Sequence, residues 1–282
     1  MTIAVTGATG QLGRLAIAEL KSRLPADKII ALVRDPAKAA DLGVAARPFD
    51  YQKPESLAPA LDGVDVLVLI SSNDFNDRAG QHANVVKAAK AAGVGRIIYT
   101  SILLRGDQSP MILAADHVAT EKAIAESGIP FTFLRNGWYI ENYAGGFAHA
   151  IESGALIGAS GEGRISGAAR ADYAAAIAVT AANDGHQGRV YELAGDTAFT
   201  LADLAAELAK QSGKPVVFNN LPEDVYAGIL MQIGLPEGFA KVLADCDAKA
   251  EQGALFDETH TLSKLIGRPT TPMAEVVRAA LK

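Results

Sequence analysis

Short apolar runs alternate with amphipathic stretches through the first half of the chain. The runs cover residues 3–6, 28–33, 45–48, 64–70, 96–100 and 130–134. Near-continuous apolar runs of this length are typical of strands buried on both faces, as in a parallel sheet. The stretches between them, 12–24, 37–42, 54–61, 77–92 and 112–127, are expected to be helical. Strands that alternate with helices predict βαβ units and an open, doubly wound α/β sheet.

This alternation ends after Asn136. We expect helices over 138–151, 171–182 and 201–211, strands over 190–193 and 216–218, and two short glycine-bounded stretches near 156–157 and 164–166. The sequence therefore predicts a Rossmann-type dinucleotide-binding domain over 1–136 and a smaller, mainly helical C-terminal subdomain over 137–282. Some segments of the second part are expected to return to the sheet.

Composition narrows the class of protein. The chain has 282 residues, 26 basic and 32 acidic, and so a net charge of −6. Because no basic run occurs, nucleic acid is not an expected partner. A single cysteine, Cys246, excludes an internal disulfide and fits a reducing compartment. A strand begins directly at the N-terminus, and no apolar run reaches roughly 18 residues. We therefore predict a cytoplasmic protein without a membrane span.

A glycine-rich turn joins the first predicted strand to the first helix. Gly7 can adopt the positive φ of a sharp turn, Gly10 lets a bound group approach the backbone, and Gly13 lets the helix pack tightly on the strand. The helix N-terminus then offers N–H groups and partial positive charge to a pyrophosphate. This strand–turn–helix context predicts a dinucleotide site. Its expected residues are Thr6, Gly7, Ala8, Thr9, Gly10, Gln11, Leu12 and Gly13.

Polar residues also follow the other predicted strands. Because ligands of open α/β sheets bind at the carboxyl ends of the strands, these positions are candidate contacts of the cofactor. They are Arg34, Ser71, Ser72, Asn73, Thr100, Ser101, Arg135, Asn136 and Gly137.

Arg34 selects the expected cofactor. It lies 21 positions after Gly13, where an acidic residue would bind the ribose 2′-OH of NAD. A guanidinium there favours a 2′-phosphate, with assistance from Lys38, and hence NADPH. Two alternatives remain open at this stage: Asp35 could serve a 2′-OH, and Arg34 could be a solvated side chain.

The acid–base pair of ordinary carbonyl reduction is missing. Short-chain dehydrogenases usually carry Tyr-x-x-x-Lys, and none of the seven tyrosines has lysine four residues later. A quinone remains a suitable acceptor, because it is strongly electrophilic and its protons can come from water. The histidines at 82, 149, 186 and 260 show no ligand spacing, so no metal is expected.

The chain resembles the NmrA-like atypical short-chain dehydrogenases. It is most similar to the bacterial NADPH:quinone oxidoreductase type 2 proteins, with the triphenylmethane reductases as near relatives. The resemblance covers essentially the whole chain. It rests on the motifs at 6–13, 33–38, 81–85, 91–94, 128–143 and 262–271. The block from Arg135 to Tyr143 is the most specific of these and favours the quinone reductase branch.

The resemblance implies an NADPH domain, a small C-terminal domain and an acceptor pocket between them. It implies that residues 7–13 hold the pyrophosphate, Arg34 meets the 2′-phosphate, and Ser71 and Ser72 line the adenosine side. Asn142 and nearby aromatic residues would touch the acceptor. The wall of the nicotinamide would consist of Arg135, Asn136, Gly137, Trp138, Tyr139 and Ile140.

His117 is the other catalytic candidate. It begins the segment that, in typical family members, carries Tyr-x-x-x-Lys, and a near-neutral imidazole could protonate an acceptor oxygen. The alternative is a helix histidine bonded to a neighbouring loop. Similarly, the stripe of Trp138, Tyr139, Tyr143 and Phe147 could stack on the acceptor or could belong to the core.

We therefore hypothesise an oxidoreductase that transfers hydride from NADPH to a quinone or a similar planar acceptor. Its expected partner is that small molecule, and the chain is also compatible with a homodimer. The alternatives are a non-catalytic NADP(H) sensor of the NmrA type, and a reductase of triphenylmethane dyes or imines on the same fold.

Overall fold

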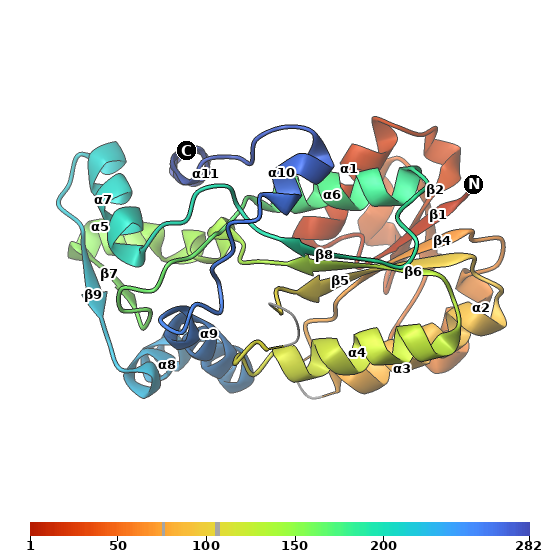
Figure 1. Cartoon of the computed structure of the whole chain (residues 1–282), viewed down its shortest axis with the longest axis horizontal. Coiled ribbons are helices and arrows are strands. Elements are labelled where there is room, and N and C mark those ends of the chain that lie inside the picture. Colours follow the sequence, from red (N-terminus) through yellow and green to blue (C-terminus); the bar gives the residue numbers. More distant parts are fainter. Residues whose placement is uncertain (75–76, 105–107) are drawn as a thin grey trace. The chain divides into compact units, whose positions relative to one another are not determined.

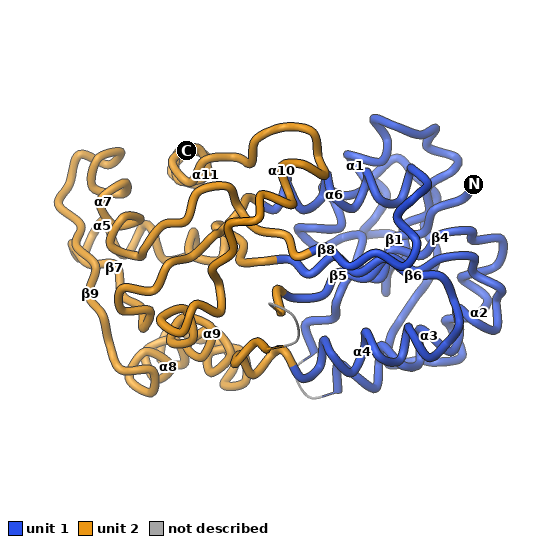
Figure 2. Tube along the Cα trace, viewed as in Figure 1, with its two compact units in different colours: residues 1–102, 115–136, 170–191 blue, residues 103–114, 137–169, 192–282 orange. Residues whose placement is uncertain are grey.

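The computed structural model describes residues 1–74, 77–104 and 108–282. Contact clustering divides the chain into two compact units (Figure 2). Unit 1 comprises residues 1–102, 115–136 and 170–191, and unit 2 comprises residues 103–114, 137–169 and 192–282.

Unit 1 is built on a seven-stranded sheet with the strand order β3-β2-β1-β4-β5-β6-β8. The strands are β1 (Ile3–Thr6), β2 (Ile29–Val33), β3 (Ala45–Pro48), β4 (Val66–Ile70), β5 (Arg96–Ile102), β6 (Phe131–Asn136) and β8 (Arg189–Leu193). The first six pair in parallel, for example Ile3 with Ile29 and Ile97 with Phe131. The predicted doubly wound parallel sheet is confirmed.

Helices cover both faces of this sheet (Figure 1). One face carries α1 (Gln11–Lys21) and α6 (Arg170–Ala182), which pack against each other. The other face carries α2 (Leu57–Ala60), α3 (Arg78–Ala91) and α4 (Ala114–Ser127). Gly93 and Gly128 end the third and fourth helices with φ of 72° and 79°, as their sequence positions predicted.

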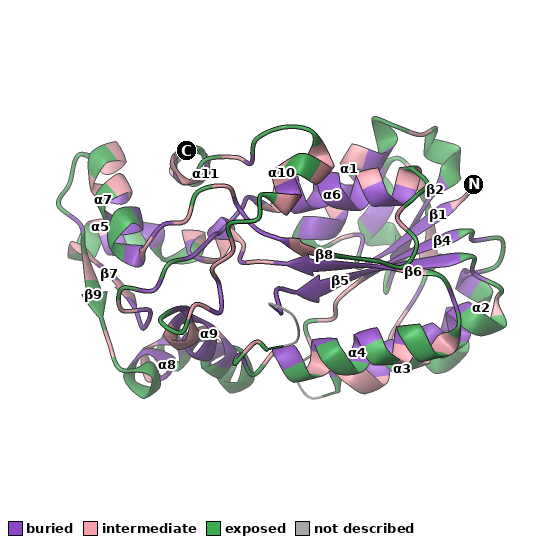
Figure 3. Cartoon of the chain, in the orientation of Figure 1, coloured by how far each residue is buried: buried purple, intermediate pink, exposed green. Residues whose placement is uncertain are grey.

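The core explains why the central strands are continuous apolar runs. Every residue of β1, β2 and β5 is buried, and the sheet is covered on both sides (Figure 3). Between the sheet and the third and fourth helices, Leu67, Tyr99 and Phe133 pack against Val85 and Ile124. The segments 1–102 and 115–136 of unit 1 thus share one hydrophobic core.

Short 3₁₀ turns complete unit 1. They are η1 (Ala26–Lys28), η2 (Pro36–Leu42) and η3 (Pro54–Ser56). The predicted helix at 37–42 is therefore a 3₁₀ helix, capped at its start by Asp35 and ended by Gly43 at φ 66°.

Unit 2 is mainly helical, as expected. Its helices are α5 (Phe147–Ser153), α7 (Leu201–Ser212), α8 (Glu223–Gln232), α9 (Glu237–Ala250), α10 (Thr261–Ile266) and α11 (Met273–Ala280). Two short strands, β7 (Ala155–Gly158) and β9 (Val217–Asn220), pair in parallel as a separate sheet. The N-terminus of α7 has a capping box in which Thr200 and Asp203 each accept the other's backbone N–H.

The helix expected over 138–151 is wrong in its first half. Residues 140–142 and 144–146 form the 3₁₀ turns η4 and η5, and the α-helix begins only at Phe147. The physical reason is pairing with a distant segment: Ile140 N–H donates to the Ala168 carbonyl, 3.1 Å away, and Ala168 N–H donates to the Trp138 carbonyl, 3.0 Å away. These bonds hold the backbone extended at the point where a helix would start.

The expected division after Asn136 coincides with one boundary between the units. Residues 170–191 return to unit 1 with α6 and β8, whereas residues 103–114 belong to unit 2. The two parts as functional domains stay a prediction. Among the helices that the structure describes, none is both long enough and apolar enough to cross a bilayer.

Candidate functional site

The turn after β1 has the geometry that its glycines predicted. Gly7 has φ 58°, and Gly10 N–H closes the turn on the Gly7 carbonyl at 2.9 Å. A Cβ on Gly13 would collide with the Gly7 carbonyl oxygen and lie 2.7 Å from Ala8 Cα. The start of α1 therefore rests directly on the turn, and only glycine fits at position 13.

The N-terminus of α1 is suited to an anion. Gly10 is the N-cap and supplies no side-chain hydrogen bond, and the first turn contains no acidic residue. The N–H groups of this turn therefore keep their partial positive charge for a group outside the helix. Gln11 is exposed, whereas Leu12 and Gly13 are buried against the strand.

Thr6, the last residue of β1, fixes the start of this turn through its buried hydroxyl. Its side chain is fully buried, and its hydroxyl accepts the Ile70 N–H at 2.9 Å and lies 2.6 Å from the Tyr51 hydroxyl. Burial raises the pKa of Tyr51, so this phenol stays protonated. Thr6 thus joins the ends of β1 and β4 and fixes the backbone from which the glycine turn departs.

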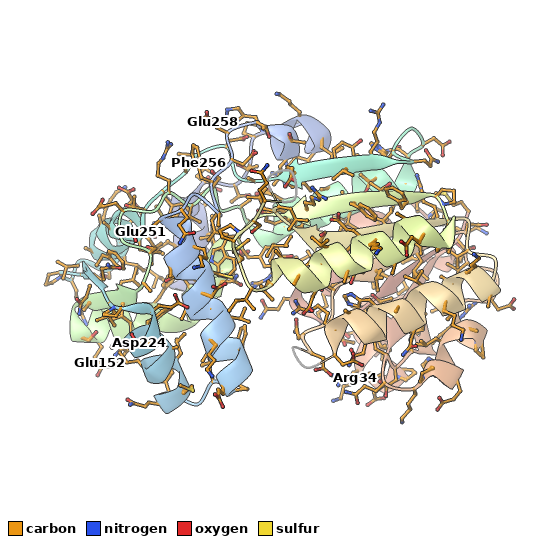
Figure 4. All side chains as sticks on the ribbon, turned by 60° about the horizontal axis from the view of Figure 1, so that its bottom comes forward. Arg34, Glu152, Asp224, Glu251, Phe256 and Glu258 are labelled. Atoms are coloured by element: carbon orange, nitrogen blue, oxygen red, sulfur yellow. The ribbon has the colours of Figure 1, made fainter. Side chains whose placement is uncertain are left out.

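A cationic hollow lies beside the turn. Thr9, Arg34, Asp35 and Lys38 line it, and its volume is about 320 Å³. Both cations are exposed; Arg34 is labelled in Figure 4. One oxygen of Asp35 accepts the Ala37 N–H at 3.0 Å and so caps the following 3₁₀ helix. The arrangement offers two positive charges to an anionic group next to the glycine turn.

Arg14 connects the two segments that line this hollow. The sequence analysis did not identify this role. Its guanidinium donates to the Thr9 carbonyl at 3.2 Å and to the Lys38 carbonyl at 3.3 Å, and it pairs with Asp41. This contact with Arg14 lowers the pKa of Asp41. The side chain therefore ties the glycine turn to the 3₁₀ helix that carries Lys38. Its position directly after Gly13 was the one available signal.

The segments after β4 and β5 are also connected. Ser71 N–H donates to the Thr100 hydroxyl at 3.0 Å, and Ser72 N–H donates to the His82 ring at 3.0 Å. Thr100 and Ser101 are buried, while Asn73 is exposed. One hydrogen bond thus holds the segment after β4 to β5, and another holds it to α3.

His117 lies inside unit 1 on the sheet-facing side of α4. It is 6% exposed, and its Nδ1 lies 2.8 Å from the Tyr99 hydroxyl. Burial, reinforced by the charge of Arg78, holds the pKa of His117 well below its usual range. The ring is therefore neutral, and its observed partner is a strand tyrosine.

Glu121, one turn beyond His117, pairs with Arg135. The guanidinium donates twice to the carboxylate, at 3.0 Å and 2.6 Å, and both side chains are buried. This bidentate pair joins the end of β6 to α4. His117 and Glu121 thus occupy the (i, i+4) positions of one helix face, and both make contacts to the sheet.

The remaining candidate residues belong to unit 2. Gly137 N–H donates to the Leu193 carbonyl at 2.7 Å, and the segment from Trp138 to Ile140 pairs with Ala168. Asn142 is half-buried, and its N–H donates to the Tyr139 carbonyl at 3.0 Å. The candidate residues at 137–142 therefore share one tightly bonded segment.

Tyr143 ends this segment and contacts a buried carboxyl group. Its hydroxyl donates to Asp247 Oδ1 at 3.0 Å, and Ala159 N–H donates to Oδ2 at 3.2 Å. Burial raises the pKa of Asp247 to about 6, although both hydrogen bonds act against this shift. Asp247 could not be singled out from the sequence, because an isolated aspartate on a helix is ordinarily solvated. No cluster that could hold a metal occurs among the described residues.

Three comparisons place these features among known proteins. Quinone oxidoreductase 2 from Escherichia coli strain K12 is 55% identical over 278 residues, which are 98% of this chain and 97% of that protein. The crystal structure of the Escherichia coli NADPH-dependent quinone oxidoreductase with NADPH has a TM-score of 0.95 at 54% identity and full coverage of both chains. The Citrobacter triphenylmethane reductase with NADP(H) has a TM-score of 0.93 at 40% identity and covers 99% and 100% of the two chains.

These similarities confirm the resemblance predicted from the sequence motifs. The family model described as NAD(P)H-binding matches residues 7–184, a range that includes the glycines of the turn after β1, Arg34 and the parallel strands β2 to β6. The chain therefore belongs to the NAD(P)H-binding family.

Proposed function

We propose that this protein is an NADPH-dependent reductase that transfers hydride to a quinone. The observation that carries the cofactor assignment is the cationic hollow of Arg34 and Lys38 beside the glycine turn. The acceptor class is supported by the 55% identity to quinone oxidoreductase 2 over nearly the whole chain.

The residues of unit 1 fit NADPH. The uncapped N-terminus of α1 suits the pyrophosphate, and the close approach permitted by Gly10 suits its contact with the backbone. Arg34 and Lys38 would hold the 2′-phosphate. Because Asp35 already uses one oxygen to cap the 3₁₀ helix, it is a poor partner for a ribose 2′-OH. We therefore assign NADPH rather than NADH.

The chemistry of the proposed site rests on orientation. When bound, NADPH supplies the hydride. The buried, neutral His117 contacts Tyr99, and Glu121 is paired with Arg135, so neither residue is poised as an acid. A quinone needs no strong acid, since its reduced oxygens can take protons from water. The Arg135–Ile140 block and Asn142 remain the proposed wall for the nicotinamide and the acceptor, and rate would come from holding the two in register.

The direct test is NADPH oxidation by the purified protein with 1,4-benzoquinone or a naphthoquinone, followed by absorbance. Replacing Arg34 by alanine should raise the KM for NADPH roughly 10- to 100-fold and leave that for NADH nearly unchanged, as expected for one charge-assisted contact. Arg23→Ala is the matched control, because Arg23 is an exposed arginine near the other end of α1. Absence of quinone turnover, or equal effects of R34A on both cofactors, would contradict the proposal.

A second acceptor class is favoured by the 40% identity to triphenylmethane reductase. Side-by-side turnover of a quinone and a triphenylmethane dye would rank the two. We further propose a cytoplasmic location, since the single cysteine, Cys246, cannot form an internal disulfide and fits a reducing compartment.

A further inference from the structure

Ser72, in the segment after β4, is bonded through all of its polar groups. Its N–H donates to His82 Nε2 at 3.0 Å, and its carbonyl accepts from Arg78 Nε at 2.8 Å. Its hydroxyl donates to Gln81 Oε1 at 3.0 Å and accepts the Asp74 N–H at 3.0 Å. Three side chains from the first five residues of α3 thus fix this one residue.

Gln81 extends the same network. Its side-chain N–H donates to Asp74 Oδ2 at 2.6 Å while its Oε1 accepts from Ser72. Gln81 is 5% exposed and His82 is fully buried. Buried polar groups that are fully bonded hold a single arrangement, because any other would leave donors or acceptors unsatisfied. We call residues 71–74 the Ser72 segment.

The contacts of His82 define its tautomer. A backbone N–H can only donate, so Nε2 must be unprotonated to accept from Ser72. The Thr120 hydroxyl donates to the Asp116 carbonyl at 2.8 Å and therefore accepts from His82 Nδ1–H at 2.9 Å. The ring packs edge-on against Tyr51 and Tyr99, with centroids 6.0 and 5.5 Å away. An imidazolium would direct a proton at the Ser72 N–H.

The Ser72 segment begins beside the glycine turn. β4 pairs directly with β1, with Val68 opposite Val5, and Ile70 is bonded to Thr6. The site of a Cβ on Gly7 is 3.8 Å from the Ile70 side chain. The backbone at 71–73 is therefore fixed next to the turn proposed to hold the pyrophosphate. A segment that is ordered before binding does not lose entropy on binding, which raises affinity.

We propose that Gln81 and His82 are positioning residues for NADPH, which hold the Ser72 segment in the conformation that receives the adenosine half of the cofactor. This role requires the Nδ1–H tautomer of His82, because only then can Nε2 accept the Ser72 N–H. The inference rests on the proposed function and adds to it a role for α3, which would act on the cofactor through its hydrogen bonds to Ser72.

Two substitutions of His82 separate its two hydrogen bonds. In His82→Gln, the side-chain oxygen can occupy the position of Nε2 and accept from Ser72. In His82→Asn, the amide nitrogen can occupy the position of Nδ1 and donate to Thr120, but Ser72 loses its acceptor. Each variant removes the imidazole and keeps one bond, and the two side chains differ by a single methylene group. We expect His82→Asn to raise the Kd for NADPH about tenfold relative to His82→Gln, with kcat for benzoquinone at saturating NADPH unchanged.

Calorimetric titration with NADPH and with NADP⁺ measures the Kd values. Equal Kd values in the two variants, or a fall in kcat without a change in Kd, would overturn the proposal and reduce His82 to a packing residue. If both variants fail to fold, Gln81→Ala decides the question: it should raise the Kd with kcat unchanged, and an unchanged Kd refutes the proposal. Lys87→Ala, an exposed position on the same helix, is the control.

Different results would refute the proposed quinone reduction and the positioning role of Gln81 and His82. If the native protein binds NADPH but reduces no quinone, the proposed function is refuted, while the ratio of the NADPH Kd values of His82→Asn and His82→Gln still tests the role of the Ser72 segment. If quinone is reduced and this ratio is one, the proposed function stands and the positioning role is refuted.

Discussion

Burial shifts the pKa of two histidines in unit 1 and of one carboxyl group in unit 2 in opposite directions. In unit 1, burial drives the pKa of His82 down to about 3 and holds that of His117 well below its usual range, with Arg78 as a secondary cause. In unit 2, burial raises the pKa of Asp247 to about 6, opposed by Ala159 N–H and the Tyr143 hydroxyl. One unit holds neutral bases that resist protonation, and the other holds an acid that retains its proton.

This difference couples each unit to pH with opposite sign. The histidines have folded pKa values below the unfolded value, so their stabilisation is present above about pH 6.5 and is lost as the pH falls. Asp247 has a folded pKa above its unfolded value. Its stabilisation is present below about pH 4 and is lost as the pH rises through about 6. The same cause, removal from water, therefore makes acid destabilising through the two histidines of unit 1 and stabilising through Asp247 of unit 2.

The largest expected effect concerns the buried ion pair of unit 1. In this pair each buried charge is stabilised by an oppositely charged partner. Glu121→Gln takes the carboxylate from the Arg135 guanidinium, and we expect a loss of about 3–5 kcal/mol in the free energy of unfolding, measured by urea denaturation at pH 7.5. Glu126→Gln is the control on the same helix. It removes an exposed pair with Lys122, 3.8 Å apart, and should cost about 0–1 kcal/mol. A loss below 1 kcal/mol in both variants would show that the buried pair is not required.

The second prediction isolates one histidine. His117→Asn keeps a polar group near Tyr99 but cannot be protonated. In the native protein, His117 should lower the stability of unit 1 as the pH falls below about 6.5, because burial disfavours the protonated ring. The variant should lose this contribution, so that hydrogen exchange of amides in unit 1 depends less steeply on pH between about 6.5 and 4.5. His149→Asn replaces an exposed histidine of unit 2 and should leave this slope unchanged.

The smallest expected effect has the opposite sign. Between pH 4 and 6, Asp247 should make amides of unit 2 less protected as the pH rises, by about 2 kcal/mol in total. Asp247→Asn should abolish this dependence. Asp224→Asn, at an exposed position on α8 (Figure 4), should leave it intact. If the dependence persists in D247N, the two units do not differ in the way that their buried groups imply.

Much of the fold could be predicted because its determinants are local. Apolar runs of four to seven residues and the glycines at 7, 93 and 128 define strands and turns from the sequence alone. The helix expected from Trp138 failed because its backbone pairs with Ala168, a partner that no local pattern reveals. Local signals thus predict elements, and long-range pairing decides where they start.

The same limit applies to the candidate site. Arg34 and Lys38 were predictable, because their spacing from Gly13 reflects a βαβ unit of standard length. Arg14 contacts Asp41 across 27 positions, His82 contacts Thr120 across 38, and Asp247 contacts Tyr143 across 104. Such partners cannot be inferred from one sequence. The motif at 81–85 was visible only as part of a family resemblance, and its contacts to Ser72 now give it a physical reason.

The three-part composition of unit 1 constrains how the protein can be made. Helix α6 packs on α1 and on β4, β5 and β6, and Arg96 donates to the Ala181 and Asn183 carbonyls. A nascent chain that ends at residue 136 lacks this helix and the edge strand β8, so of these two helices only α1 covers that face of its sheet. Unit 1 is therefore complete only after the chain has been synthesised through residue 191, and until then part of an apolar sheet face stays exposed.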